Sequence, residues 1–130
     1  MKRVYIAGKL NADACAYLQN VAVMIRTAVA VRRLGFSVFI PCLDLLTGVV
    51  AGDLTYHDYA DNNMRWLEVA DAVLVLPGWE TSKGTRAEIA RAEELGIPVY
   101  YSIEDLCRTS VSSAPDPGPD PALPGLSVET

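Results

Sequence analysis

The sequence predicts a doubly wound α/β domain built on one parallel β-sheet. Between residues 4 and 101, short runs of β-branched and aromatic residues alternate with longer Ala- and Leu-rich segments. This alternation is typical of strand–helix–strand units with right-handed crossovers. One of the short runs is apolar without alternation, as expected for a central strand that is covered on both faces. With 130 residues, 51% of them hydrophobic, the chain can bury the core of one domain but is too short for two.

Two strands and a long helix are expected in the first 40 residues. The run VYIA at 4–7 ends on Gly8, which suits a buried strand followed by a tight turn. Residues 14–34 are rich in Ala, Leu, Val and Met and contain neither Gly nor Pro, so they predict a long helix that stops at Gly35. The run FSVFI at 36–40 predicts the second strand.

A long connection is expected after the second strand. Residues 41–55 begin with proline, contain Gly48 and Gly52 and have mixed polarity. They predict a loop that is longer than a usual βα connection, and loops of this length are commonly lids or binding loops. A second helix is expected over about 56–69.

The second half of the chain repeats the strand–helix–strand pattern. The run AVLVL at 72–76 predicts the central strand, and a Pro-Gly pair breaks it. Thr81 or Ser82 could cap the next helix, which we expect to continue to Leu95. The run IPVYY at 97–101 predicts a last strand, whose proline indicates a sheet edge.

These elements favour the flavodoxin-like strand order 2-1-3-4. In that order the first and third strands are neighbours, and ligands bind beyond their carboxyl ends, where the strand order reverses. The turn at 8–11 would then face the segment 77–85. Residues 108–130 are rich in Ser, Pro, Asp and Gly, which predicts a flexible tail and places the domain at residues 1–107.

The charge balance argues against a polymeric nucleic acid as partner. Sixteen acidic and eleven basic residues give a formal charge of -5, so the chain lacks the positive surface that a phosphate backbone requires. A single nucleotide stays possible, because backbone N–H groups can hold one phosphate.

Cysteine spacing and hydropathy argue against a metal site, a disulfide framework and a membrane span. Cys15, Cys42 and Cys107 show no paired spacing, so neither a metal site nor a disulfide framework is expected, and no cofactor is implied. No signal peptide is recognised, and the apolar stretch 21–31 is interrupted by Arg26 and too short to span a bilayer. We therefore expect a cytoplasmic protein with no membrane partner.

The start of the helix near Ser82 is the strongest candidate site. Its first-turn N–H groups attract anions, and Gly84 allows close approach to the backbone. Glu88 follows Thr85 by one turn and is in line with the apolar stripe of the helix, so its carboxyl would be held near the sheet. Burial raises a carboxyl pKa, and such groups concentrate at functional sites. A half-buried glutamate that caps a helix or pairs with Arg91 is, however, the commoner role.

Three segments resemble the nucleoside 2-deoxyribosyltransferase superfamily, particularly its small phage and bacterial branch. They are VYIAG at 4–8, WLEVADAVLVLPGWE at 66–80 and SKGTRAEIARAEELGIPV at 82–99. The resemblance covers about residues 1–106, and the last two segments together are fairly specific.

The resemblance assigns roles to individual residues. It implies that Glu88 is the nucleophile that captures the anomeric carbon. In related members that cleave nucleoside monophosphates, a serine six residues earlier holds the phosphate, and Ser82 has this spacing. Tyr5 and Gly8 match the part that contacts the sugar or positions the carboxylate. Because family members complete their sites with residues from a neighbouring subunit, a homo-oligomer is also implied.

One position departs from the family pattern. Asn63 stands where the family usually has an aspartate that protonates or orients the departing base, and an amide cannot act as a general acid. Asp61, Asp58 or Asp44 could take over this role, or the activity could be altered or lost.

The expected binding residues are completed by the loop after the central strand and by the helix start. Trp79 could stack on a base, although packing explains it equally well, and Trp66 is expected in the core. Gly84 and Thr85 would lie near the substrate phosphate or carboxylate.

Three functions remain open on the sequence. The first is an enzyme that cleaves or transfers the N-glycosidic bond of a nucleoside or nucleoside 5'-monophosphate, with a carboxylate stabilising or trapping the sugar cation. The second is a nucleotide-binding or sensing module that has lost the acid, which Asn63 favours. The third is an interaction domain that recruits partners through its Pro-rich tail.

Overall fold

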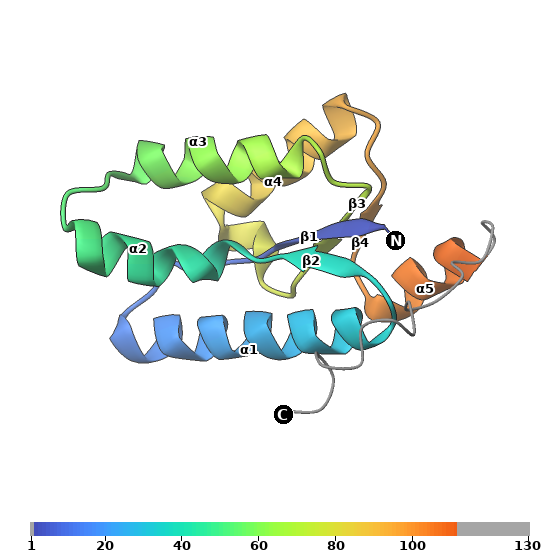
Figure 1. Ribbon diagram of the computed structural model, residues 1–130, viewed down its shortest axis with the longest axis horizontal. Helices are drawn as coiled ribbons and strands as arrows, with labels where there is room; N and C mark the ends of the chain where they lie inside the picture. The colour runs from blue at the N-terminus through green and yellow to red at the C-terminus, as the bar shows by residue number, and fades with distance from the viewer. Residues whose placement is uncertain (1, 112–130) are drawn as a thin grey trace, which may run out of the picture.

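The computed structural model describes residues 2–111, except for the side chains of Leu45, Ser110 and Val111. Four strands form one parallel sheet in the order β2-β1-β3-β4, which confirms the expected 2-1-3-4 order (Figure 1). The elements are, in order, β1 (Arg3–Ala7), α1 (Ala14–Arg33), β2 (Ser37–Phe39), η1 (Pro41–Leu43), α2 (Asp44–Ala51), α3 (Tyr56–Leu67), β3 (Ala72–Val75), η2 (Trp79–Thr81), α4 (Lys83–Glu94), β4 (Val99–Tyr100) and α5 (Ile103–Val111).

The sheet is covered by helices on both faces. Val4, Ile6 and Leu74 point to one face, where they pack with Met24 of α1 and Leu106 of α5. Figure 1 shows α1 and α5 on this side and α3 and α4 on the opposite side. Full burial of a large aliphatic side chain is worth roughly 1.5–3 kcal/mol, so this layer accounts for much of the stability.

The second face of the sheet positions the candidate site. Tyr5 and Ala7 of β1 point to this face, together with Val73 and Val75 of β3. They pack against α3 and α4, whose buried contacts include Ile89. Because successive residues of a strand point to opposite faces, the side chain of Tyr5 is directed towards α4 while its neighbours in β1 face α1.

The segment 41–55 is not the open loop that the sequence predicted. It holds η1 and α2, which ends on Gly52 at φ 79°. Gly48 was expected to break helical structure, but it lies inside α2, where a Cβ would stand 2.0 Å from the Tyr59 hydroxyl oxygen. The glycine therefore permits close packing of α2 against α3.

Helix α5 was also not expected from the sequence. Ser102 caps it by accepting a hydrogen bond from the backbone N–H of Asp105 at 3.1 Å, and the Ser-x-x-Asp spacing is a recognised helix start signal. Leu106 anchors the helix in the core. Helix α5 continues past residue 107, the expected end of the domain, and residues 112–130 of the proposed tail lie outside the described residues.

Helix α1 is longer than the apolar stretch singled out in the sequence. By length and composition alone, it could cross a membrane, a property shared by core helices of soluble proteins and by signal sequences. In this structure Met24, Ala28 and Val31 are buried, so the helix packs one face on the sheet.

Candidate active site

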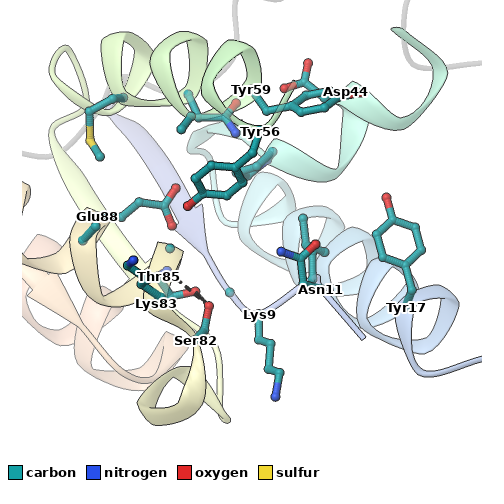
Figure 2. A pocket seen from close by; sticks show the side chains of 18 of the residues that line it. Lys9, Asn11, Tyr17, Asp44, Tyr56, Tyr59, Ser82, Lys83, Thr85 and Glu88 are labelled. Carbon is teal, nitrogen blue, oxygen red and sulfur yellow. Dashed lines mark hydrogen bonds between the residues drawn. The ribbon is translucent and has the colours of Figure 1, made fainter. Parts of the chain in front are cut away.

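A cavity of about 950 Å³ opens beyond the carboxyl ends of β1 and β3. This is the place where the strand order reverses and where ligands bind in open α/β sheets. Its walls come from the β1–α1 turn, α1, η1, α2, α3 and the start of α4 (Figure 2). A cavity of this size falls in the range that encloses a small organic ligand.

Glu88 forms part of the cavity wall and is hydrogen-bonded to the sheet below it. The hydroxyl of Tyr5, fully buried in β1, donates to Oε2 of Glu88. Burial raises the pKa of Glu88 to about 7, and the Tyr5 hydrogen bond partly opposes this shift. Burial, followed by the negative charge of Glu88, raises the pKa of Tyr5. The glutamate is thus a partly buried carboxyl that changes charge near neutral pH.

The alternative structural role of Glu88 is not seen. Arg91 instead pairs with Glu68 at 2.9 Å and with Glu94 at 2.7 Å. Ser82, and not the glutamate, caps α4. Glu88 therefore lines the cavity and contacts Tyr5, and it neither caps α4 nor pairs with Arg91.

The start of α4 forms a polar end of the cavity. The Ser82 hydroxyl oxygen accepts hydrogen bonds from the backbone N–H of Thr85 at 3.2 Å and from its hydroxyl at 2.8 Å. Gly84 also lines the cavity, and a Cβ there would stand 3.2 Å from the Tyr56 hydroxyl oxygen. The structure thus brings Ser82, Gly84, Thr85 and Glu88 to one cavity, as expected from their spacing.

Two lysines add positive charge to this end. Lys9 lies in the β1–α1 turn with Gly8, and its Nζ donates to the Thr81 hydroxyl oxygen at 3.1 Å. Lys83 lines the cavity from the first turn of α4. Together with the helix N-terminus, these groups favour an anion. From the sequence, Lys83 is expected to be a solvated helix charge that could assist phosphate binding. Lys9 has no local signal of its own, although its turn is expected to face residues 77–85.

Helices α2 and α3 form the opposite wall. Asn63, Tyr56 and Tyr59 line the cavity from α3, and Asp44 lines it from α2. Within the described part of the chain, Oδ2 of Asp44 and Oδ1 of Asn63 are buried without a hydrogen-bond partner. Burial raises the pKa of Asp44. A buried acceptor without a donor is costly, so these atoms are candidates for contact with a ligand once side chains adjust.

Two expected site residues lie elsewhere. Asp61 is on the exposed side of α3, where it pairs with Arg65 at 3.2 Å. Trp79 lies in η2 and packs against Tyr101, with ring centroids 5.5 Å apart, outside the cavity lining. Trp66, expected in the core, is 52% exposed and stacks on Phe39.

Asp58, an alternative to Asn63, is used in folding. Its carboxylate accepts from the backbone N–H of Thr55 at 2.7 Å and completes the capping box of α3. These hydrogen bonds lower the pKa of Asp58. In residues 2–111, no group of three or more His, Cys, Asp and Glu side chains is placed to hold a metal ion.

Comparison with solved structures places this geometry in a known fold. The chain is similar to a 2-deoxyribosyltransferase from the psychrotolerant bacterium Bacillus psychrosaccharolyticus, which is described as a biocatalyst for the synthesis of nucleosides. The TM-score is 0.54 at 20% sequence identity, and the match covers 83% of this chain and 80% of the other. The chain therefore has the nucleoside 2-deoxyribosyltransferase-like fold.

Sequence comparison gives the family. No curated protein matches the chain significantly. The model of one family, Domain of unknown function (DUF4406), matches residues 2–101 and so covers every strand of the sheet and the whole cavity lining. The chain belongs to this DUF4406 family.

Proposed function

We propose that the protein cleaves or transfers the N-glycosidic bond of a nucleoside or nucleoside 5'-monophosphate, with Glu88 as the nucleophile. The observation that carries the proposal is the position of Glu88. Its carboxyl lies in the wall of a cavity that ends at a helix N-terminus, and Tyr5 fixes it from below. The similar bacterial protein is described as a 2-deoxyribosyltransferase that serves the synthesis of nucleosides, which supports the nucleoside part of the proposal.

The chemistry requires one carboxylate next to the anomeric carbon. As the C1'–N bond breaks, its electron pair leaves with the base, and positive charge develops on the sugar. The Glu88 carboxylate stabilises this charge and forms an ester bond to C1'. Water or a second base then attacks C1' and releases Glu88, which gives hydrolysis or transfer. The hydrogen bond from Tyr5 orients the carboxylate and keeps a larger part of it ionised.

The polar end of the cavity suits a 5'-phosphate. Lys9 and Lys83 bring positive charge to the first turn of α4, and Ser82 retains its own hydroxyl proton as a possible donor. Helix N-termini bind phosphates through backbone N–H groups and the helix dipole. We therefore propose that a nucleoside 5'-monophosphate binds more tightly than the nucleoside. Equal affinity for the two in calorimetry would contradict this.

A non-catalytic nucleotide-binding module is the second candidate. It is favoured by Asn63, whose amide lines the cavity and cannot supply the proton that a departing base requires. Such a module would bind the same ligands and release no base.

The two candidates differ in a direct assay. The full chain is incubated with a panel of 2'-deoxynucleosides and their 5'-monophosphates, and free base is measured by chromatography. Enzyme function predicts base release that Glu88→Gln lowers by about a thousandfold or more. Glu93→Gln is the control, because Glu93 lies exposed on the same helix. Tight binding without base release would instead support the binding module.

We also propose that the protein works as a homo-oligomer in the cytoplasm. In support, α1 exposes Leu18 and Ile25, and α2 exposes Leu46 and Val50, the last with 86% of its surface accessible. Exposed apolar side chains can favour association where a second copy buries them. A single monomeric species at all concentrations in sedimentation would argue against the assembly.

A further inference from the structure

Two carboxyl groups line the cavity among the residues that the structure describes. Glu88 comes from α4 and Asp44 from the first turn of α2, on a different side of the cavity in the view of Figure 2. The charge of Asp44 contributes to the raised pKa of Tyr5, whose hydroxyl donates to Glu88. Both carboxyl groups therefore line the same cavity, Glu88 in contact with Tyr5 and Asp44 on the wall formed by α2.

The surroundings of Asp44 do not favour its charged form. Its Oδ2 is buried and has no hydrogen-bond donor within residues 2–111, and no ion pair with a lysine or arginine is formed there. Glu88, in contrast, accepts a hydrogen bond from Tyr5. A carboxyl without donors holds its proton more readily than one that is hydrogen-bonded as an anion. The two groups therefore differ in their hydrogen-bond partners. In the empty cavity, however, burial raises the pKa of Glu88 to about 7, so a bound substrate must favour the carboxylate of Glu88 and the protonated form of Asp44.

The proposed cleavage of the N-glycosidic bond needs a general acid next to the departing base, on the cavity wall formed by α2 and α3. A base that leaves from C1' carries the electron pair of the broken bond, and a proton on one of its nitrogens makes it a better leaving group. Asn63 cannot provide this proton. The hydroxyls of Tyr17, Tyr56 and Tyr59 also line the cavity, but phenols are weaker acids than a carboxyl by about six pKa units.

On the basis of this proposed function, we propose that Asp44 is the general acid of the reaction. Its carboxyl proton passes to a nitrogen of the base while the C1'–N bond breaks and Glu88 bonds to C1'. In the second half of the reaction, the Asp44 carboxylate takes a proton from the attacking water or base, while the ester bond between Glu88 and C1' breaks. Each carboxyl then returns to its starting state.

Substrate binding would set the two protonation states. In the empty cavity burial already raises the pKa of Asp44, and a bound base excludes more water from it. The carboxylate form of Glu88 is instead favoured by the hydrogen bond from Tyr5 and, during the reaction, by the positive charge that develops on the sugar. The titratable groups around Asp44 and its cavity are Tyr5 of β1, Tyr17 of α1, Cys42 of η1, Tyr56 and Tyr59 of α3, and Lys9, Lys83 and Glu88 across the cavity.

The test compares leaving groups that do and do not need a proton. The substrates are the nucleotide that the wild-type chain cleaves and 4-nitrophenyl 2-deoxyriboside 5-phosphate, whose nitrophenolate leaves as a stable anion. We expect Asp44→Asn to slow base release at least 100-fold and to slow nitrophenolate release less than about threefold. Asp53→Asn, an exposed change just beyond α2, should preserve both rates.

Three results would overturn the assignment. Asp44→Asn could cleave the nucleotide at the wild-type rate, or it could lose both activities equally, which would mean a structural role. The third result comes from the wild-type chain alone, should Asp44→Asn not fold. For the wild-type chain, we expect the rate of nucleotide cleavage to decline at alkaline pH while the rate of nitrophenolate release does not. Parallel pH–rate profiles for the two substrates would exclude Asp44 as the general acid. Absence of any cleavage by the wild-type chain would contradict the proposed function itself, and the acid with it.

Discussion

Glu88 is subject to two opposing influences that together place its pKa near 7. Burial beside the sheet favours the protonated form, whereas the hydrogen bond from Tyr5 favours the carboxylate. A nucleophilic carboxylate must be ionised, so these influences determine the pH range in which the proposed reaction runs. Both can be changed by single substitutions.

Replacing Tyr5 by Phe should move the pH dependence of base release. Loss of the hydrogen bond removes the influence that lowers the pKa of Glu88, so that pKa rises above 7. The acidic limb of the pH–rate profile should shift to higher pH by about 1–2 units, since hydrogen bonds to charged groups are worth about 1.5–3 kcal/mol. Tyr101→Phe, at an exposed position, is the matched control. An unshifted limb would show that Tyr5 does not tune Glu88.

Glu88→Gln should stabilise the fold at alkaline pH. The pKa of Glu88 is raised from 4.5 to about 7 on folding, so the glutamate costs no stability below pH 4.5 and an increasing amount as the pH rises to about 7. Glutamine stays neutral throughout. The variant should therefore be more stable than wild type at pH 8, by on the order of 1–3 kcal/mol, and similar at pH 4. Urea denaturation at both pH values measures this, and a difference that does not depend on pH would contradict it.

Most secondary-structure elements could be predicted from the sequence, but helices α2 and α5 could not. The four strands and the helices α1, α3 and α4 have strong local signals, and the structure confirms them. Gly48 gave the wrong signal for α2, because its role is contact with Tyr59 rather than a turn. The same limit applies to the cavity. Ser82 and Glu88 were found from spacing within one helix, whereas Lys9 and Tyr17 join the cavity only through tertiary contacts.

Gly48→Ala should separate stability from binding. Alanine favours a helix over glycine by about 1 kcal/mol, but its Cβ would displace the ring of Tyr59, a cavity residue. We expect a melting temperature within a few degrees of wild type and about tenfold weaker nucleotide binding by calorimetry. Val50→Ala, on the exposed side of the same helix, should leave binding unchanged. Unaltered binding by Gly48→Ala would mean that Tyr59 does not contact the ligand.

The whole molecule is held together by two apolar layers that lie within residues 4–106 in the described part of the chain. Leu106, the last of these core residues, belongs to a helix that the sequence did not predict. The sequence-based boundary at residue 107 follows from composition, which records where prolines begin but not which side chains are buried. Among the residues that the structure describes, every core side chain lies at or before residue 106.

Two changes near the C-terminus should therefore differ in effect. Leu106→Ala removes a side chain that is 1% exposed and should lower the free energy of unfolding by about 2–5 kcal/mol. A chain ending at residue 111 should retain the melting temperature of the full chain, because it keeps both layers. Thermal unfolding of both proteins measures the contrast. A large loss of stability in the shortened chain would show that residues 112–130 belong to the domain.

The hydrogen bond between Tyr5 and Glu88 joins residues 83 positions apart. During synthesis, most of the domain must leave the ribosome before this contact can form. Closing such a large loop is entropically costly, and in the folded chain the parallel pairing of β1 with β3 spans a similar separation along the sequence. A partly made chain that ends before residue 88 therefore lacks this contact, and Tyr5 has no carboxylate to pair with until α4 has been made.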